Sequence, residues 1–204
     1  MLDAMGVMFQ AQDDVAELLV PFIQRINPKI TSSSIEEAYL DASLGEISAD
    51  EFWTSFGIDP SVEEDYLARH SLNHGLRSFL GFARESGIEL SCLSNDVSRW
   101  SQRLRQTFGL DEYFSNFVIS GDIGIRKPNE GAYLELIRRT GEAPENILFV
   151  DDRRKNVRAA RAVGLRSIVF DSRNRLRGDV SSFAELSDIV AGTSAIGHFQ
   201  IPDP

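Results

Sequence analysis

The chain has 204 residues, of which 42% are hydrophobic and 25% are charged, as is typical of one globular domain or of a core domain with a smaller insertion. Such a chain buries a sizeable core without disulfides, and its single cysteine, Cys92, excludes an internal disulfide and a zinc site built from several cysteines. The net charge of −10 opposes contacts with nucleic-acid phosphates. No apolar run approaches the roughly 18 residues that span a bilayer, and the N-terminus lacks the basic start of a secretory signal. We therefore expect a cytoplasmic protein that binds neither nucleic acid nor a membrane.

The first nine residues, MLDAMGVMF, predict a short apolar strand that ends at a turn. From residue 13 the apolar period becomes that of a helix, which Pro21 kinks or restarts. Ser34-Ile-Glu-Glu37 and Ser48-Ala-Asp-Glu51 match the capping box and predict two further helices. A fourth helix is expected over 61–69. No strand pattern occurs between residues 10 and 74, so we expect this segment to be all-helical.

The acidic residues are concentrated in the same part of the chain. Residues 9–75 hold 13 acidic and 3 basic side chains, whereas the remainder holds 18 of each. The whole net charge thus belongs to one segment, which indicates a separate unit.

From residue 75 onward, helical and strand patterns alternate. Each strand is short, apolar and bounded by turn residues, as buried parallel strands are. The alternation predicts an α/β fold with a doubly wound parallel sheet, and in such sheets ligands bind at the carboxyl ends of the strands. The expected helices cover 76–86, 97–107, 129–140 and 153–163, and the expected strands cover 88–93, 117–120, 147–150 and 167–170.

Polar side chains stand at the expected carboxyl ends of four strands. They are Asp3, Ser94, Lys127 and the pair Asp151 and Asp152. Taken singly, each has a structural explanation as a turn carboxylate, a helix N-cap or a solvated lysine held extended by the following proline. Taken together, they form a constellation for phosphoryl transfer.

The chemistry gives each of these side chains a role. Asp3 is the candidate nucleophile, which attacks phosphorus to give an aspartyl-phosphate. One close pair of like charges costs about 4 kcal/mol at an effective dielectric near 20. Mg²⁺ held by Asp3, a backbone carbonyl and Asp151 or Asp152 offsets this repulsion. Lys127 adds a second positive charge, and the Ser94 hydroxyl holds the phosphoryl oxygens.

The motifs together resemble those of a known superfamily. LDAMGVMF, LSND, GIRKPNEGAY and FVDDRRKNVRAARAVG resemble, in this order, the four motifs of the haloacid dehalogenase-like hydrolases. LGEISADEFWTSFGI resembles the helical cap that this superfamily carries between the first strand and the rest of the core. The resemblance implies a Rossmann-like core over 1–8 and 76–204 with an inserted α-helical cap over 9–75.

The resemblance also assigns site residues. It implies that Asp3 is the nucleophile, with Ser94 and Lys127 as the second and third motifs. The metal ligands implied are Asp3, the carbonyl of Met5, Asp151 and Asp152, and the phosphate-binding residues implied are Ser94, Asn95 and Lys127.

Met5 departs from the pattern of the superfamily. Its phosphatases carry a second aspartate two residues after the nucleophile, which protonates the leaving group and then deprotonates the attacking water. A thioether does neither. Three explanations stay open: a substrate with a good leaving group such as an acyl phosphate, an acid borrowed from the cap, or a protein that binds with little turnover.

We therefore predict a weak or specialised Mg²⁺-dependent phosphatase that acts on a small phosphorylated metabolite. One alternative is a 2-haloacid dehalogenase, because Tyr133 follows Lys127 by six residues as the active-site tyrosine does in those enzymes, although they are metal-independent and lack the acidic pair. The other is an impaired regulatory module whose acidic cap binds a basic partner. We assign neither the substrate nor an oligomeric state.

Overall fold

The parallel sheet is built around the first residues of the chain. Its strands are β1 Ser91–Ser94, β2 Asn116–Ile119, β3 Leu148–Asp151 and β4 Arg166–Val169. In the computed structural model, which describes residues 1–175 and 178–196, Leu2 forms parallel bridges to Cys92 of β1 and Val150 of β3. Because β1 pairs with β2 and β3 with β4, the order is β2, β1, Leu2, β3, β4, all parallel. The predicted parallel sheet is confirmed.

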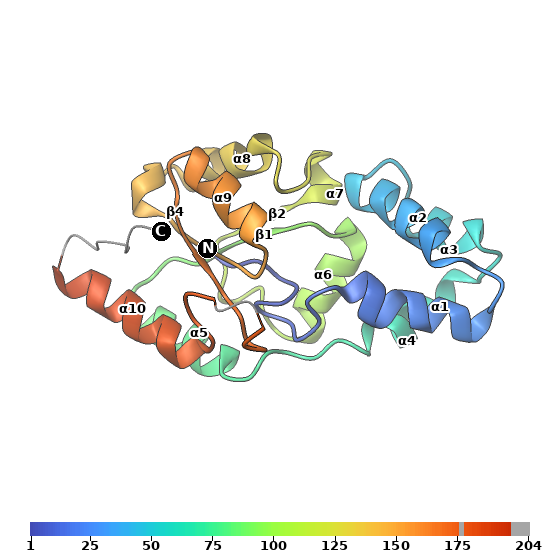
Figure 1. Cartoon of the computed structure of the whole chain (residues 1–204), viewed down its shortest axis with the longest axis horizontal. Helices are drawn as coiled ribbons and strands as arrows, with labels where there is room; N and C mark the ends of the chain where they lie inside the picture. The colour runs from blue at the N-terminus through green and yellow to red at the C-terminus, as the bar shows by residue number, and fades with distance from the viewer. Residues whose placement is uncertain (176–177, 197–204) are drawn as a thin grey trace.

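Helices cover both faces of the sheet, as strands that are apolar on both sides require. They are α5 Leu76–Glu85, α6 Ser98–Thr107, α7 Ser120–Ile123, α8 Glu130–Thr140, α9 Arg154–Ala162 and α10 Phe183–Ile196. Figure 1 shows α8 and α9 on one face of the sheet, and α5 and α10, which contact each other, on the other.

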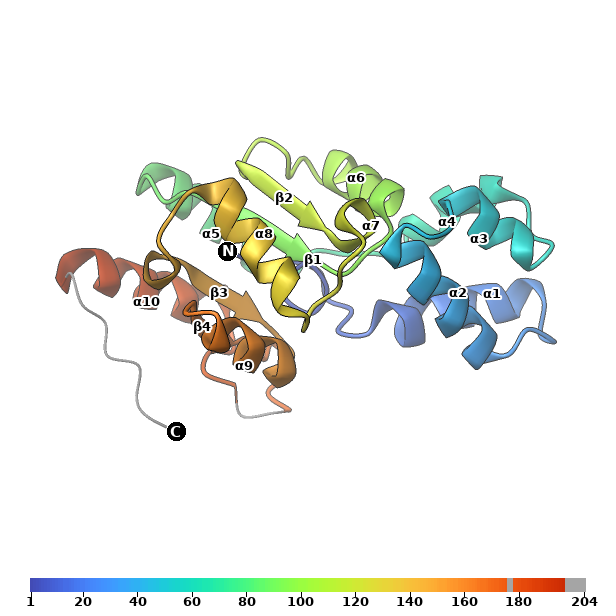
Figure 2. The same ribbon diagram turned by 90° about the horizontal axis from the view of Figure 1, so that it is seen from above.

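The remaining helices form the helical cap, by which we mean the helices between residues 15 and 67. They are a π-helical turn Val15–Leu19, α1 Val20–Ile26, α2 Ser32–Leu44, α3 Ala49–Ser55, a 3-10 turn Pro60–Val62 and α4 Glu63–Leu67. Figures 1 and 2 show α1 to α4 together at one end of the molecule, and in Figure 2 the strands run toward them. The carboxyl ends of the strands therefore face the cap. The boundaries at 8/9 and 75/76 stay a prediction.

Two of the predicted helix signals act as expected. Pro21 lies in the first turn of α1, directly after the π-helical turn, so it restarts the helix. Ser48 and Glu51 form the capping box of α3, in which the Ser48 hydroxyl accepts a hydrogen bond from the Glu51 N–H at 3.1 Å and the Glu51 carboxylate accepts one from the Ser48 N–H at 2.7 Å.

Other local predictions are wrong. The capping box expected at Ser34 is absent because α2 begins earlier, with Thr31 as its N-cap, and the Thr31 hydroxyl accepts a hydrogen bond from the Ser34 N–H. The first strand shrinks to the bridge at Leu2, since the chain turns directly afterwards and the Phe9 N–H donates to the Ala4 carbonyl. Helices α7 and α10 were not expected, because a four-residue helix carries no period and the pattern after β4 is weak.

An aromatic cluster and one buried carboxylate join the helical cap to α6. The rings of Trp53 and Tyr66 lie 5.6 and 5.0 Å from that of Trp100, between centroids. The Glu63 carboxylate accepts hydrogen bonds from the indole N–H groups of Trp53 at 3.1 Å and Trp100 at 2.7 Å, and from Arg99 at 2.7 Å. Its side chain is only 3% exposed. One carboxylate therefore holds donors from both parts of the molecule.

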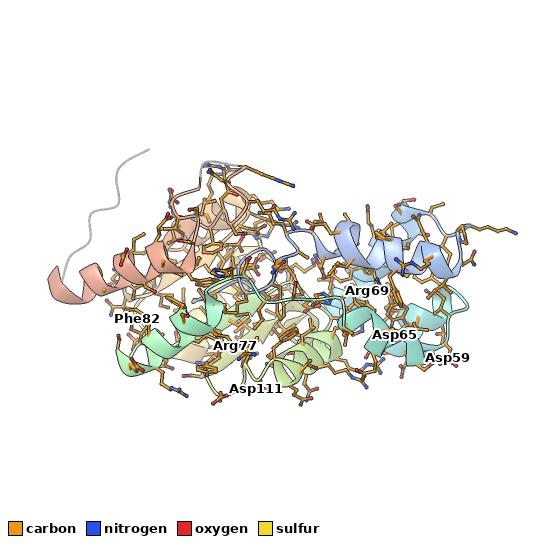
Figure 3. The ribbon with its side chains drawn as sticks, turned by 90° about the horizontal axis from the view of Figure 1, so that it is seen from below. Asp59, Asp65, Arg69, Arg77, Phe82 and Asp111 are labelled. Atoms are coloured by element: carbon orange, nitrogen blue, oxygen red, sulfur yellow. The ribbon has the colours of Figure 1, made fainter. Side chains whose placement is uncertain are left out.

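The acidic surplus of the cap is displayed on its outer surface. Figure 3 labels Asp59 and Asp65, which are both exposed, on the cap side of the molecule. Arg69 lies nearby with its guanidinium carbon 4.8 Å from the centre of the Phe22 ring. Arg77 and Phe82, both on α5, mark the α/β side of the same view. Arg69 is thus used in packing against the cap, whereas Asp59 and Asp65 face solvent.

We expect Glu63→Ala to lower the free energy of unfolding by roughly 3–5 kcal/mol, because it leaves two indole N–H groups and a guanidinium without their buried acceptor. Urea denaturation followed by tryptophan fluorescence measures this loss. Glu64→Ala is the matched control, since Glu64 is exposed and its ion pair with Arg103 lies at the surface. Equal losses in the two variants would contradict the role of Glu63.

Candidate active site

The N-terminal turn places Asp3 beside the acidic pair that ends β3. The Asp3 N–H donates to the Val150 carbonyl at 2.9 Å, and the Asp3 carboxylate accepts a hydrogen bond from the Ala4 N–H at 2.7 Å. Gly6 has a φ of +79°, and a Cβ there would lie 2.4 Å from a carboxylate oxygen of Asp152. The turn therefore requires glycine at this position so that the backbone can pass close to Asp152.

Lys127 joins two carboxylates at the ends of different strands. Its Nζ lies 2.6 Å from Asp3 and 2.8 Å from Asp151, and it donates to the Leu93 carbonyl at 2.7 Å. Burial alone would lower the pKa of Lys127, but the charges of Asp151 and Asp3 and their hydrogen bonds raise the pKa above its usual value. The ammonium group therefore stays charged at neutral pH.

Asp151 is fully surrounded by hydrogen-bond donors. Besides Lys127, it accepts hydrogen bonds from the Asn156 amide at 3.0 Å and from the Arg153 N–H at 2.8 Å, and it is completely buried. Its partner in the acidic pair, Asp152, is different. The Oδ1 atom of Asp152 is buried and has no hydrogen-bond partner among the described residues. Asp152 thus keeps one oxygen available for a ligand.

The three carboxylates carry more negative charge than Lys127 neutralises. Burial raises the pKa of Asp3 well above its usual range; Lys127 opposes this shift, and the charge of Asp151 adds to it. Burial and the charge of Asp151 likewise raise the pKa of Asp152 to about 7. Burial is the largest cause of both shifts, and positive charge beside these carboxylates opposes it.

The arrangement of these carboxylates fits a divalent cation. Asp3, Asp151 and Asp152 each offer an oxygen, and these oxygens lie within 4.8 Å of one another. An all-oxygen donor set suits Mg²⁺, and the unpartnered Oδ1 of Asp152 is the kind of atom that a metal would bind. A bound cation would also supply the missing positive charge.

Ser94 and Asn95, which follow one another at the end of β1, have different surroundings. The Ser94 hydroxyl is buried and has no hydrogen-bond partner among the described residues. The Asn95 amide donates to the Lys127 carbonyl at 2.9 Å and accepts from the Lys127 N–H at 2.8 Å. Asn95 therefore fixes the backbone that carries Lys127, while phosphate binding by these residues stays a prediction.

A cavity of about 490 Å³ under the cap is lined by several of the predicted site residues, whereas Asp151 and Asp152 are not among its lining residues. Its walls include Asp3, Ser94, Asn95 and Lys127, and Met5 lies in the same wall as Asp3. Met5 is itself buried, so the buried side chain two residues after Asp3 ends in a thioether rather than a carboxylate. The ends of these strands therefore lie close together, as the sequence predicts. The chemistry assigned to their residues stays a prediction.

Sequence reasoning missed three residues of this site. Asn156 holds Asp151, and its only signal was its place five residues after Asp151 in FVDDRRKN. Asp14 is a buried acid from the start of the cap, and it lines the cavity. Arg126 also lines it, with its guanidinium carbon 5.5 Å from the centre of the Tyr39 ring. Neither Asp14 nor Arg126 had a sequence signal beyond its charge.

Tyr133, the residue behind the dehalogenase alternative, lies in the core. Its side chain is fully buried, and its hydroxyl donates to the Asn156 carbonyl at 3.0 Å. Tyr133 is absent from the described lining of the cavity. Its contacts support the segment that holds Asp151.

Most of the chain matches a known protein family. A family model described as haloacid dehalogenase-like hydrolase matches residues 11–164. The chain belongs to the haloacid dehalogenase-like hydrolases. This membership confirms the superfamily that the motifs indicated and the α/β core with a helical cap.

Curated relatives of the chain include several phosphatases. The phosphoserine phosphatase of Thermus thermophilus is 35% identical over 104 residues, which cover 50% of this chain and 42% of that protein. The phosphoglycolate phosphatase of Nitrosococcus oceani is 25% identical over 170 residues, which cover 82% of this chain and 72% of that protein. The chain thus spans less than half the length of the Thermus relative.

Solved structures of this superfamily share the fold at low sequence identity. A phosphatase of the superfamily from Thermococcus onnurineus superimposes with a TM-score of 0.69 at 22% identity, over 94% of this chain and 96% of that chain. An L-2-haloacid dehalogenase from Xanthobacter autotrophicus gives a TM-score of 0.65 at 17% identity, over 94% and 97% of the two chains. These likenesses establish the architecture. Over the described residues, none of the helices has the length and apolar character needed to traverse a bilayer.

We expect Asp152→Asn to weaken Mg²⁺ binding at least about tenfold, because even residues outside the ligand shell of a metal site typically contribute 10–100-fold in affinity. Isothermal titration calorimetry with MgCl₂ measures this change. Asp65→Asn is the matched control, since it removes the same charge from the outer surface of the cap. Equal affinity in the wild type and both variants would contradict a metal site at the acidic pair.

Proposed function

We propose that this protein is a Mg²⁺-dependent phosphatase that forms an aspartyl-phosphate on Asp3. The observation that carries the proposal is the buried ammonium of Lys127 between Asp3 and Asp151, 2.6 and 2.8 Å from their oxygens, in the wall of one cavity. A carboxylate nucleophile needs such a cation beside it, because the incoming phosphate is itself anionic.

Each residue of the site has a part in this reaction. Asp3 attacks phosphorus while Lys127 balances the charge that develops on the phosphoryl oxygens. The unpartnered hydroxyl of Ser94 donates a hydrogen bond to one of these oxygens. Asp3, Asp151 and Asp152 would hold Mg²⁺ together with the carbonyl of Met5. The metal, when bound, supplies Lewis-acid stabilisation of the phosphate.

The substrate that the cavity favours is a small phosphorylated metabolite. About 490 Å³ accommodates a phosphate ester of a few carbon atoms rather than a polymer. Arg126, Arg153 and Lys155 line the cavity in addition to Lys127, so a second anionic group on the substrate has cations to meet. The curated relatives named above are phosphatases of phosphoserine and phosphoglycolate, which both carry a carboxylate.

The dehalogenase alternative has less support. The acidic pair, with an unpartnered oxygen on Asp152, favours a metal-dependent reaction, and the hydroxyl of Tyr133 is used inside the core. No contact among the described residues favours a regulatory module with an acidic cap. A substrate panel that contains phosphate esters, acyl phosphates and 2-haloacids tests both alternatives.

Asp3→Asn is expected to reduce phosphate release to the background rate, since Asp3 is the proposed nucleophile and the lining carboxylate that contacts Lys127. The fold should survive this nearly isosteric change, because Lys127 retains Asp151 as a partner. Phosphate release from a panel of phosphate monoesters and acyl phosphates, with and without Mg²⁺, measures the effect.

Asp59→Asn is the control for this experiment, because Asp59 lies on the outer surface of the cap and asparagine can replace it as the N-cap of the following turn. Wild-type turnover in pure Asp3→Asn protein would show that the chemistry lies elsewhere. Halide release from a 2-haloacid without turnover of any phosphate would instead favour the dehalogenase.

A further inference from the structure

The proposed reaction needs a proton donor, and none of the residues given a part in it above provides one. Expulsion of an alkoxide requires protonation of its oxygen, and hydrolysis of the aspartyl-phosphate requires that a water molecule lose a proton. Met5 stands where the side chain for both steps would be expected, and its thioether has no exchangeable proton. Another group of the cavity must therefore donate and accept these protons.

Two titratable groups of the cavity, Lys127 and Tyr39, already have hydrogen-bond partners. Lys127 is held by Asp3 and Asp151 as a charged group. The Tyr39 hydroxyl donates to the Asn95 carbonyl at 3.2 Å, and burial raises the pKa of Tyr39 well above its usual value. Neither group is suited to exchange a proton with substrate at neutral pH.

The acids that the cap contributes to the cavity wall are Asp13, Asp14 and Glu36. Asp13 and Glu36 are exposed, whereas Asp14 is only 6% exposed. The Asp13 carboxylate accepts a hydrogen bond from the Ala16 N–H at 3.1 Å and lies 3.6 Å from Arg153. Asp14 has no ion pair and no hydrogen bond to another side chain within the described ranges 1–175 and 178–196. Asp14 is thus the one buried acid of this group.

The segment that carries Asp14 is fixed to the α/β part of the molecule. The Arg173 guanidinium lies 2.6 Å from the Glu17 carboxylate and donates to the Gln10 carbonyl at 2.8 Å. Arg153 donates to the Gln12 carbonyl at 3.2 Å. These contacts hold residues 10–17 from both sides of Asp14. Its carboxylate is therefore positioned before substrate binds, as a catalytic acid requires.

We propose that Asp14 is the general acid and base of this site and takes over the role that Met5 does not fill. The inference rests on the proposed function, because it deepens the same reaction. It follows from the position of Asp14, which is buried, lines the same cavity as Asp3 and makes no ion pair among the described residues.

The two steps balance as follows. In the first, a carboxylate oxygen of Asp3 bonds to phosphorus, the bond from phosphorus to the ester oxygen breaks, and the proton of the Asp14 carboxyl passes to that oxygen, so that an alcohol leaves. In the second, a water oxygen bonds to phosphorus, its proton passes to the Asp14 carboxylate, and the bond to Asp3 breaks. Phosphate leaves, and both aspartates return to their initial states.

The surroundings of Asp14 suit a group that exchanges protons near neutrality. Burial raises the pKa of Asp14 to about 6; the charge of Asp13 adds to the shift, and Arg153 opposes it. Tyr39 of α2, Tyr66 of α4 and Asp96, which follows β1, also interact electrostatically with Asp14. A carboxyl group with such a pKa is present in both protonation states at physiological pH, as a group that acts first as acid and then as base must be.

The test compares substrates that need an acid with substrates that do not, using the full chain with Mg²⁺. We expect Asp14→Asn to reduce kcat for an alkyl phosphate such as glycerol 3-phosphate by about 10²–10⁴-fold. With 4-nitrophenyl phosphate, whose leaving group needs no proton, the first step should persist. The second step should become slow, so stopped-flow absorbance should show a burst of one 4-nitrophenolate per enzyme.

Two further variants complete the test. Glu37→Gln removes an exposed acid of α2 that is not among the lining residues of the cavity, and it is expected to leave the turnover of both substrates unchanged. Met5→Asp in the Asp14→Asn background is expected to restore part of the alkyl phosphatase activity, because it returns a carboxylate beside Asp3. Should Asp14→Asn fail to fold in a thermal melt, Asp14→Ser is the replacement, since serine also suits the start of a helix.

The possible outcomes separate the two proposals. An active wild type whose Asp14→Asn variant keeps its rate on alkyl phosphates would overturn the role of Asp14 alone. Equal losses on both substrates without a burst would also overturn it, because they would indicate a role in binding or structure. A wild type that hydrolyses no phosphate would overturn the proposed function itself.

Discussion

The arrangement of the site depends on the buried ammonium of Lys127. Three carboxylates at the edge of the sheet would repel one another, and the charge of Lys127 between Asp3 and Asp151 offsets part of that repulsion. The amide of Asn95 fixes the backbone of Lys127, and the amide of Asn156 satisfies Asp151 on its other side. Because this network is anchored to strands β1 and β3 and to the N-terminal turn, the geometry of the site is set by the sheet.

Much of the fold and part of the site follow from the sequence, for a physical reason. Alternating apolar strands and amphipathic helices leave few topologies, and parallel strands bring Asp3, Ser94 and Asp151 to one edge whatever the details of the helices. Local signals succeeded where one motif had no competitor, as at Ser48 and Glu51. They failed where several hydroxyl residues compete, as at Thr31 and Ser34, each of which could cap the same helix.

The remaining features depend on contacts between segments that are distant in the sequence. Local sequence patterns therefore do not predict them. Helix α10 is stabilised by packing against α5 rather than by its own pattern. Asn95, the last residue of LSN in the motif, uses its amide to hold the backbone of Lys127, 32 residues later. The burial of Asp14 likewise requires the cap to lie over the strand ends, whereas Asp13 beside it stays exposed.

The position of Asp14 has a consequence for how the two parts of the molecule work together. A second carboxylate at Met5 would share the rigid turn of Asp3, so its distance to phosphorus would be set by the sheet alone. Asp14 instead stands where the chain enters the cap, directly before its first helical turn. Glu63 accepts hydrogen bonds from donors of both the cap and α6, and so holds the cap against the α/β part of the molecule. The role proposed for Asp14 therefore couples acid–base chemistry to the position of the cap, and loosening the Glu63 junction should slow steps that need a proton more than those that do not.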